Sequence, residues 1–268
     1  MYAKAAWDGW KDFTITKHVD ESGTIASFDL TPTDKSMLPL KPYKAGQFIT
    51  VRVWVPELQC YQNRHYSLSD KNQEGHYRIT VKREDGNAAK ATPNGIVSTI
   101  LHELPVGSTV QAAFPIGSFV LPDPAPKNIV LFSAGVGITP NLAILNAVSQ
   151  EDPAHGPNVS WIQCTRNPAE HVFKKHVAEI ADRSDGKVRT VAYYDGVDSV
   201  DASAGENIFA QRLNVKEMDR SLLPLDDADA AYFICGPDAF MKDVRRDLEE
   251  LGVRPKQITI EAFRAGEL

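Results

Sequence analysis

Hydrophobic and polar positions alternate in short runs along the first half of the chain. The runs are rich in Val, Ile, Thr and aromatic residues, and Gly, Pro and Asp turns separate them, which predicts an antiparallel barrel or sandwich. One helix interrupts this pattern from Gly95 to His102, where Ile96, Thr99 and Ile100 share a helical face. The predicted strands are Phe13–Val19, Ile25–Leu30, Gln47–Val55, Tyr77–Arg83 and Thr109–Phe114.

Nearly continuous apolar strands alternate with amphipathic helices in the second half. Only a sheet covered on both faces tolerates strands that are apolar on both sides, so this pattern predicts a doubly wound α/β domain with a parallel sheet. From Asp195 to Leu223 the polarity is high and no clear element emerges. The predicted strands are Asn128–Ser133, Val159–Cys164, Val188–Tyr193, Ala231–Cys235 and Gln257–Ile260, and the predicted helices are Pro140–Ser149, Pro168–Asp182 and Pro237–Leu251.

The proline-rich stretch Leu121–Lys127 separates the two patterns and is the expected domain boundary. The 268 residues, 43% of them hydrophobic and 24% charged, are typical of a globular protein of one large or two modest domains. A net charge of −6 argues against a nucleic-acid partner. Without a signal-peptide core or a run of ~18 to 20 apolar residues, we expect a cytoplasmic protein with no membrane partner.

The cysteine content limits the redox chemistry of the chain. Cys60, Cys164 and Cys235 form no CxxC pair, so a disulfide framework is not expected. Three cysteines also cannot supply the four ligands of a ferredoxin-type iron-sulfur cluster.

Two segments of the second half carry candidate nucleotide chemistry. Ser133–Pro140 (SAGVGITP) follows the first predicted strand, where glycines let backbone amides approach a phosphate and a helix from Pro140 directs its positive end towards it. Cys235-Gly236-Pro237 ends the fourth strand at the same carboxyl edge, where open parallel sheets bind ligands. Each segment alone fits a tight turn or a packed cysteine, but together they favour a nucleotide.

Two further segments lie in the first half. Arg64–Ser67 (RHYS) follows a predicted strand and offers a guanidinium for a phosphate, a flat ring and a hydroxyl donor. Gly95–Ser98 (GIVS) opens the predicted helix and supplies backbone amides for an anion. Either segment alone also fits an ordinary strand edge or helix cap.

These four segments, in this order, resemble motifs of the ferredoxin-NADP reductase superfamily, and most closely those of the reductase module of flavohaemoglobins. RHYS resembles the flavin motif R-x-Y-S, GIVS the pyrophosphate motif, GVGITP the nicotinamide-nucleotide motif and CGP the nicotinamide-facing loop. The resemblance implies an FAD-binding β-barrel domain, residues 1–124, followed by an NAD(P)H-binding α/β domain, residues 125–268. It extends to Trp7–Phe13, Ala45–Phe48, Val81–Glu84 and Glu261–Phe263.

The resemblance implies that the first domain holds FAD. Arg64 would hold the phosphates, Tyr66 would stack on the flavin ring, and Ser67 would hydrogen-bond near flavin N5. The implied FAD contacts are Phe48, Arg64, His65, Tyr66, Ser67, Val81, Lys82, Gly95, Val97, Ser98 and Phe263.

The second domain would hold NADH or NADPH, with the pyrophosphate on the glycine-rich segment and the nicotinamide beside Cys235. Glu261 would place a carboxylate near the flavin edge, so the implied catalytic residues are Ser67, Cys235 and Glu261. No metal site is expected, since His171 and His176 do not share a helical face. The implied nucleotide contacts are Gly135, Val136, Gly137, Thr139, Pro140, Cys235, Gly236 and Pro237.

The implied activity is an FAD-dependent NAD(P)H oxidoreductase, in which hydride passes from nicotinamide to flavin and electrons pass to an external acceptor. That acceptor would be a separate haem protein, a quinone, a ferric complex or oxygen. A flavin-dependent biosynthetic enzyme acting on one organic substrate is the alternative. A third hypothesis is a non-catalytic binding module, against which the intact motifs argue.

Two departures from the family pattern affect these expectations. Phe263 is followed by Arg264–Gly266, where the family usually continues F-G-P. The residues include no counterpart of the globin domain, so nitric oxide dioxygenation within this chain is not expected. Arg166, after the second predicted strand, would either meet the 2′-phosphate of NADPH or be solvated, which leaves the coenzyme preference open.

Overall fold

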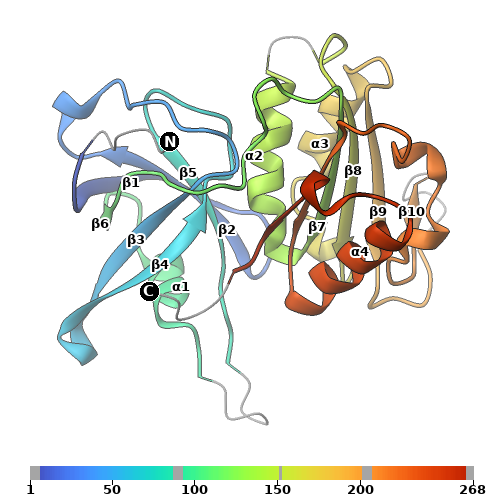
Figure 1. Cartoon of the computed structure of the whole chain (residues 1–268). Helices are drawn as coiled ribbons and strands as arrows, with labels where there is room; N and C mark the ends of the chain where they lie inside the picture. Colours follow the sequence, from blue (N-terminus) through green and yellow to red (C-terminus); the bar gives the residue numbers. More distant parts are fainter. Residues whose placement is uncertain (1–6, 87–92, 151–152, 201–206, 264–268) are drawn as a thin grey trace. The chain divides into compact units, whose positions relative to one another are not determined.

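A computed structural model describes residues 7–86, 93–150, 153–200 and 207–263 of the protein. The chain divides into two compact units between Ser118 and Phe119. This division falls shortly before the proline-rich stretch Leu121–Lys127 that we predicted as the boundary. The first unit is mainly β and the second is α/β, which confirms the predicted fold class (Figure 1).

Six antiparallel strands form the sheet of the first unit, in the spatial order β4-β3-β6-β1-β2-β5. An isolated bridge between Leu68, directly after β4, and Ile79 of β5 joins the two edges of this sheet and closes it into a barrel. The strands are β1 (Lys11–Asp20), β2 (Ile25–Pro32), β3 (Phe48–Val55), β4 (Cys60–Ser67), β5 (Tyr77–Lys82) and β6 (Thr109–Ala112).

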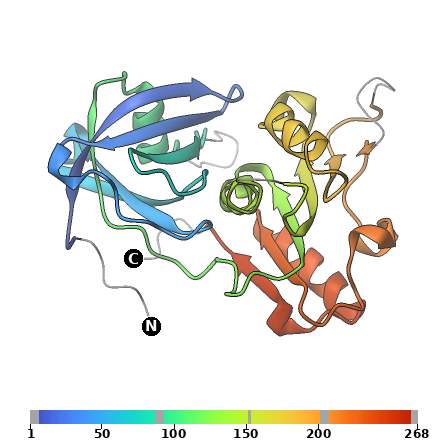
Figure 2. The ribbon, with the colours of Figure 1, turned by 90° about the horizontal axis from the view of Figure 1, so that it is seen from above.

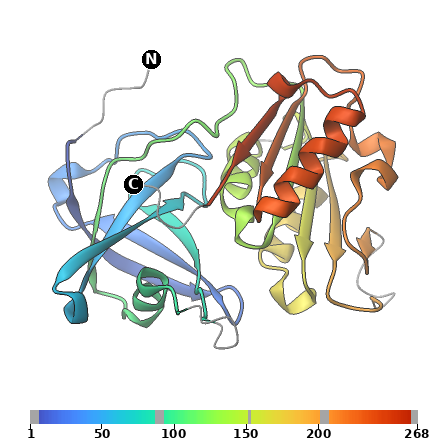
Figure 3. The same cartoon turned by 60° about the horizontal axis from the view of Figure 1, so that its bottom comes forward.

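The barrel core follows the two-residue period of its strands. Along β3, every second residue from Ile49 to Val55 is buried, whereas Trp54 between them is 46% exposed. The helix α1 (Ile96–Glu103) lies at one end of the barrel, as Figure 3 shows. It contributes the buried side chains of Val97 and Leu101 to the same apolar cluster.

The strand β4 was not predicted from the sequence. We expected Arg64–Ser67 to follow a strand, but these four residues are the last four of β4. The segment is polar and lacks a regular apolar alternation, so its own pattern does not indicate a strand. Pairing with β3 along its full length, from Val55↔Cys60 to Phe48↔Ser67, makes it one.

Six parallel strands form the sheet of the second unit, in the order β10-β9-β8-β7-β11-β12. The order reverses between β7 and β11, and right-handed crossovers therefore place α2 and α3 on one face and α4 on the other (Figure 2). The strands are β7 (Asn128–Ala134), β8 (Asn158–Thr165), β9 (Val188–Tyr194), β10 (Ile208–Phe209), β11 (Ala231–Cys235) and β12 (Ile258–Glu261), and the helices are α2 (Ile138–Val148), α3 (Lys174–Asp182) and α4 (Asp238–Glu250).

Two helices begin elsewhere than predicted. The helix α3 begins at Lys174 rather than Pro168, because Phe173 has a φ of 61° and interrupts the helical path after a 3-10 turn at Pro168–Glu170. The helix α2 begins at Ile138, directly after a 3-10 turn formed by Gly135–Gly137. Pro140 is its third residue, where a backbone N–H would have no intrahelical acceptor.

The short strand β10 lies in the stretch from Asp195 to Leu223, where the sequence pattern defined no element. Its two residues pair with Ala192 and Tyr193 of β9. None of the helices in the described part of the chain has the length and apolar character needed to cross a membrane.

Candidate functional site

The end of β4 carries the flavin motif on both sides of the strand. The Arg64 side chain is exposed, and its Nη1 donates to the carbonyl of neighbouring Asn63 at 2.6 Å, which leaves most of its donors available to an anion. Tyr66 packs partly buried against the barrel core, and burial raises the pKa of its hydroxyl. The Ser67 hydroxyl is buried and has no hydrogen-bond partner among the described residues.

An unpaired buried hydroxyl is unusual, because a buried polar group without a partner costs about 1–3 kcal/mol. A ligand that hydrogen-bonds to Ser67 Oγ would remove this cost. The structure therefore fits the role that the family resemblance implies for Ser67.

His65 of the motif packs against Phe48 of the neighbouring strand β3. His65 Nδ1 is 2.9 Å from Thr50 Oγ1, and its ring contacts that of Phe48 at a centroid distance of 4.8 Å. Burial lowers the pKa of His65, which favours the neutral ring. A Cβ at Gly117 would come within 3.1 Å of the Phe48 ring, so the absence of a side chain there sets the place of Phe48.

The pyrophosphate motif opens α1 and is hydrogen-bonded to Glu84, two residues after β5. Gly95 N donates to Glu84 O at 2.8 Å, and the Ser98 hydroxyl accepts from Glu84 N at 3.2 Å and donates to Gly95 O at 3.1 Å. A Cβ at Gly95 would lie 2.7 Å from Ser98 Oγ. The N-cap residue Gly95 has no side chain to cap the first amides of α1, which fits an anion at this end.

Three predicted FAD contacts differ in their surroundings. Val81 and Val97 are fully buried in the barrel core, so their side chains serve packing and only their backbones are available to a cofactor. Lys82 is exposed, with its Nζ 3.9 Å from Glu84 Oε1.

In the second unit, the glycine-rich turn and the CGP loop touch each other. They follow β7 and β11, the neighbouring strands between which the strand order reverses, the usual place of a nucleotide in such sheets. A Cβ on Gly137 would collide with the Cys235 carbonyl and lie 2.6 Å from Gly236 N. A Cβ on Gly236 would lie 2.9 Å from the Cβ of Ala134. The two predicted motifs therefore form one site.

The turn itself presents backbone. Gly135 is exposed with a φ of +55°, Val136 is partly exposed, and no side chain caps the amides of the turn. Pro140 cannot donate to Val136 O, and the buried Thr139 hydroxyl donates to this carbonyl instead, at 3.1 Å. Thr139 and Pro140 are buried and therefore support the turn from the interior of the unit, while the exposed amides are those of the glycine segment.

A row of residues crosses the carboxyl edge of the sheet in register. Cys235 of β11 pairs with Ser133 of β7 and with Glu261 of β12, so the three side chains lie on the same face. Cys235 is fully buried, and burial together with the charge of Glu261 raises the pKa of its thiol well above the ordinary value. Burial also raises the pKa of Glu261. Both groups are therefore biased towards their protonated forms.

The remaining predicted contacts are more open. Pro237 is exposed at the start of α4, and Phe263, two residues after β12, is 42% exposed. The departure from the family pattern at Arg264–Gly266 lies outside the described residues.

The polar residues that the sequence analysis left open have separate surroundings. Arg166 is exposed at the end of β8, and Gly196 N donates to its carbonyl at 2.9 Å. His171 Nδ1 lies 2.7 Å from the Tyr194 hydroxyl, and His176 Nε2 lies 2.7 Å from Asn146 Oδ1. Across the described ranges, no group of three His, Cys, Asp or Glu residues is placed to hold a metal.

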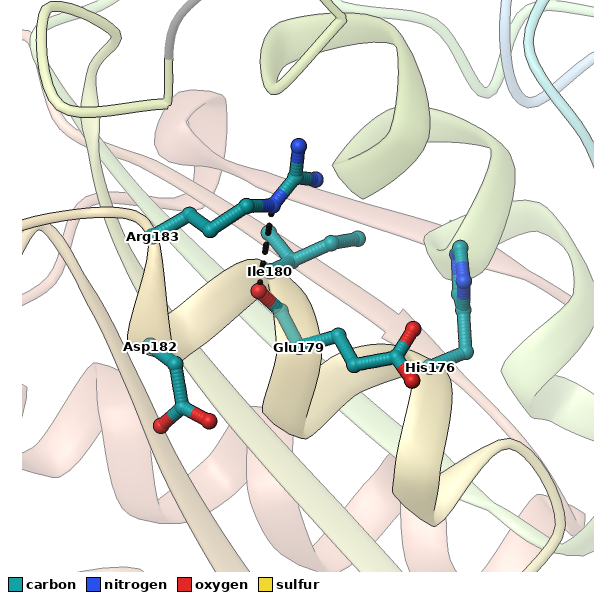
Figure 4. A pocket seen from close by; sticks show the side chains of 5 residues that line it. All are labelled: His176, Glu179, Ile180, Asp182 and Arg183. Carbon is teal, nitrogen blue, oxygen red and sulfur yellow. Dashed lines mark hydrogen bonds between the residues drawn. The ribbon is translucent and has the colours of Figure 1, made fainter.

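Two surface hollows lie away from the motifs. One, of about 350 Å³, lies on α3 and is lined by residues of both charge signs (Figure 4). The other, of about 530 Å³, lies beside the β1–β2 turn and the end of α1. Neither includes a predicted site residue. Their lining residues are His176, Glu179, Ile180, Asp182 and Arg183 in the first, and Asp20, Ser22, Gly23, Arg83, His102 and Glu103 in the second.

The structure also shows two polar residues that the sequence analysis did not place in the site. The Thr99 hydroxyl, in the first turn of α1, has no partner within the described ranges. Asn141 of α2 is fully buried and its Nδ2 donates to Phe132 O and Ser133 Oγ, both at 2.9 Å, which ties α2 to the end of β7. The sequence signal for Asn141 is an amide on a mostly apolar helix, which also contains Thr139 and Asn146.

Comparison with known proteins agrees with the two kinds of domain. Residues 11–121 match the family model of the oxidoreductase FAD-binding domain, and residues 131–246 match that of the oxidoreductase NAD-binding domain. A flavohemoprotein of Bordetella pertussis is 35% identical over 274 residues, covering 99% of this chain and 65% of the relative. A flavohemoprotein of Rhizobium meliloti is 38% identical over 258 residues, covering 96% of this chain and 61% of the relative.

Among solved structures, the chain is similar to the flavohem-like FAD/NAD binding domain of a nitric oxide dioxygenase from Vibrio cholerae. The TM-score is 0.81 at 28% identity, and the match covers 94% of this chain and 98% of that one. The chain thus spans roughly two thirds or less of the curated relatives but nearly all of this separate domain.

An FAD-binding barrel followed by a nucleotide-binding α/β unit, with both motif sets assembled, defines an FAD-containing NAD(P)H oxidoreductase. The chain belongs to the ferredoxin-NADP reductase superfamily, as a reductase module of the flavohaemoglobin type.

Proposed function

We propose that this oxidoreductase takes a hydride from NADH or NADPH into FAD and passes electrons to an external acceptor, with a ferric haem protein as the first one to test. The observation that carries the proposal is that the flavin motif lies together within the first unit and the two nucleotide motifs lie together within the second. In the first unit the buried Ser67 hydroxyl has no partner among the residues that the structure describes, and in the second unit Gly137 contacts the Cys235 loop. When bound, the flavin would accept one hydride, which carries two electrons, and could release these electrons singly, which suits a one-electron haem acceptor.

The residues have distinct proposed roles in the first unit. Arg64 provides a cationic donor for the FAD phosphates, and the uncapped amides of α1 receive the pyrophosphate. Tyr66 supplies a flat ring for the isoalloxazine, and Ser67 donates a hydrogen bond near flavin N5.

In the second unit, the amides of the Gly135–Gly137 turn receive the nucleotide pyrophosphate. Cys235, with a neutral thiol, bounds the nicotinamide side of the site as a small and polarizable group. Glu261 holds or exchanges a proton beside the reaction, since its raised pKa brings its titration closer to neutrality.

Two observations support the choice of acceptor and location. The relatives named flavohemoprotein join a similar reductase to the remainder of a longer chain, which supports a haem protein as acceptor. The three cysteines are free thiols, which supports the reducing compartment of a cytoplasmic protein.

The test is the visible absorption spectrum of the purified protein, recorded before and after anaerobic addition of NADH and then NADPH. We expect a flavin spectrum that bleaches on addition and recovers when ferric myoglobin or ferricyanide is supplied. A colourless protein that FAD does not reconstitute would refute the proposal. Bleaching without reoxidation by these acceptors would refute the external-acceptor step and favour the biosynthetic alternative.

A further inference from the structure

The bridge Leu68↔Ile79, which closes the barrel and is called the seam below, lies directly after the flavin motif. The strand β4 ends at Ser67, and Leu68↔Ile79 is an isolated bridge rather than part of a ladder. The register of this antiparallel bridge places Thr80 across from Ser67, and Arg78 across from Ser69. On the β3 side this segment is held by the Phe48↔Ser67 pair and by Leu68 N, which donates to Gln47 O at 2.9 Å. On the β5 side the isolated bridge provides less main-chain pairing.

Arg78 adds contacts on the β5 side through its side chain. Its Nη2 donates to Ser69 O at 2.5 Å, and its Nε donates to Ser69 Oγ at 3.2 Å. Its Nη1 lies 3.6 Å from Asp70 Oδ2, while the Arg78 carbonyl accepts from Ser69 N at 2.9 Å. The Arg78 guanidinium thus contacts the main chain and the side chain of Ser69 and the carboxylate of the next residue, Asp70.

The fork of a guanidinium suits this task, because its planar donors are fixed relative to one another. Hydrogen bonds from a charged donor are about twice as strong as neutral ones. The side chains of Arg78 and Asp70 are only 21% and 16% exposed, so water screens these contacts less than at an open surface.

A row of buried hydroxyls continues from Ser69 across the barrel wall. Thr80 Oγ1 donates to Ser69 Oγ at 2.8 Å, and Thr80 Oγ1 and Ser27 Oγ are also 2.8 Å apart. Ser27 Oγ donates to Glu21 Oε1 at 2.7 Å. The three hydroxyl residues are at most 4% exposed. The row therefore connects the β1–β2 turn with the seam beside Ser67.

We infer that Arg78, acting through Ser69 and Thr80, is a positioning residue for the bound flavin, because it fixes the strand end from which Ser67 presents its hydroxyl. This inference rests on the proposed binding of FAD by the first unit. Arg78 itself need not touch the cofactor. Its removal would let the seam relax, and Ser67 would lose its fixed orientation.

The test compares variants for FAD affinity and for the midpoint potential of the bound flavin. Arg78→Met should weaken FAD binding to the apoprotein roughly 10-fold to 100-fold, the range for losing a charged hydrogen bond, and should shift the midpoint potential. Arg83→Met is the matched control, since Arg83 pairs with exposed Asp85 at 2.8 Å in the same unit. It should leave both quantities unchanged.

Arg78→Lys separates charge from geometry. A lysine keeps the charge near Asp70 but cannot reproduce the fork on Ser69, so we expect only partial recovery of affinity and potential. Complete recovery would overturn the inference, because charge alone would then suffice.

Thr80→Val tests the same idea without removing a charge. This nearly isosteric change deletes the link between Ser27 and Ser69, and it serves if Arg78→Met does not fold. We expect a loss of roughly 2-fold to 10-fold in FAD affinity with a shifted midpoint potential. An unchanged potential in a folded Thr80→Val variant would overturn the inference.

FAD binding by the wild type distinguishes a failure of the proposed function from a failure of the positioning role of Arg78. If the wild type binds no FAD, the proposed function itself fails. If the wild type binds FAD and Arg78→Met behaves like Arg83→Met, only the positioning role fails.

Discussion

The two units form their proposed cofactor sites from different chemical groups. In the barrel unit, the proposed FAD contacts include side chains on an antiparallel strand, and a row of buried hydroxyls lies beside them. In the α/β unit, glycines and backbone amides at strand ends form the turn proposed for the pyrophosphate, while the proposed roles of Cys235 and Glu261 use side chains. Side-chain deletion is therefore informative in both units, whereas addition of a single methyl group is informative where a glycine lies against another loop, as Gly137 does in the second unit.

The largest effect is expected from adding a methyl group at the point of contact in the second unit. Gly137→Ala would drive a Cβ into the Cys235 carbonyl and Gly236 N, at a cost on the order of 2–4 kcal/mol of stability. The expected result is a loss of NADH-driven flavin bleaching while FAD stays bound, measured by stopped-flow absorbance and thermal unfolding.

Gly252→Ala, in the same unit but outside the motifs, is the matched control for this change. A Cβ there meets no atom within 4 Å, and the positive φ of +92° opposes it, at about 1–2 kcal/mol. Equal loss of bleaching in both variants would contradict the argument from loop contact.

The next effect comes from deleting one side chain of the first unit. Arg64→Ala removes a cationic phosphate donor, so the dissociation constant of FAD should rise roughly 10-fold to 100-fold with little change in the melting temperature. Flavin content after dialysis measures the change, with Arg83→Ala as the control. Unchanged flavin retention would remove Arg64 from the phosphate site.

A smaller effect is expected at the thiol of the second unit. Cys235→Ala should slow flavin reduction roughly 10-fold, about 1.4 kcal/mol in the barrier, while FAD affinity stays the same. Because the pKa of this thiol is raised well above the ordinary value, the rate in the wild type should show no thiolate inflection near neutral pH.

Cys164→Ala provides the matched control for the thiol. Cys164 is a partly buried thiol near the carboxyl end of β8, and burial also raises its pKa. In the Cys164→Ala variant, the flavin should be reduced at the wild-type rate. A Cys235→Ala rate equal to that of Cys164→Ala would show that the thiol has no role.

The smallest effect concerns pH. Burial raises the pKa of Glu261 above its ordinary value of 4.5, so the folded state binds this proton more tightly than the unfolded state. Its contribution to stability is present below pH 4.5 and is lost as pH rises through the raised pKa. Glu261→Gln should therefore flatten the fall in stability across that window, measured by urea unfolding at several pH values. Parallel pH profiles for the two proteins would contradict the shift.

Much of the fold could be predicted because the pattern of each element was local. The apolar runs of β7, β8, β9 and β11 and the stripe of α4 identify a parallel sheet without reference to distant residues. The short strand β10 had no such signal, because its pairing with Ala192 and Tyr193 of β9 supplies what its own two residues do not.

Some features of the candidate site were likewise predictable from the sequence, and others were not. The sequence by itself determined the motif residues and their order, and the resemblance of these motifs to a known family implied the cofactor class. Only the tertiary structure decided that Gly137 lies against the Cys235 loop, that Ser67 keeps a hydroxyl unpaired among the described residues, and that the Arg78 side chain hydrogen-bonds to Ser69. These facts depend on contacts between different strands and loops, and the local pattern of hydrophobic and polar residues does not carry that information.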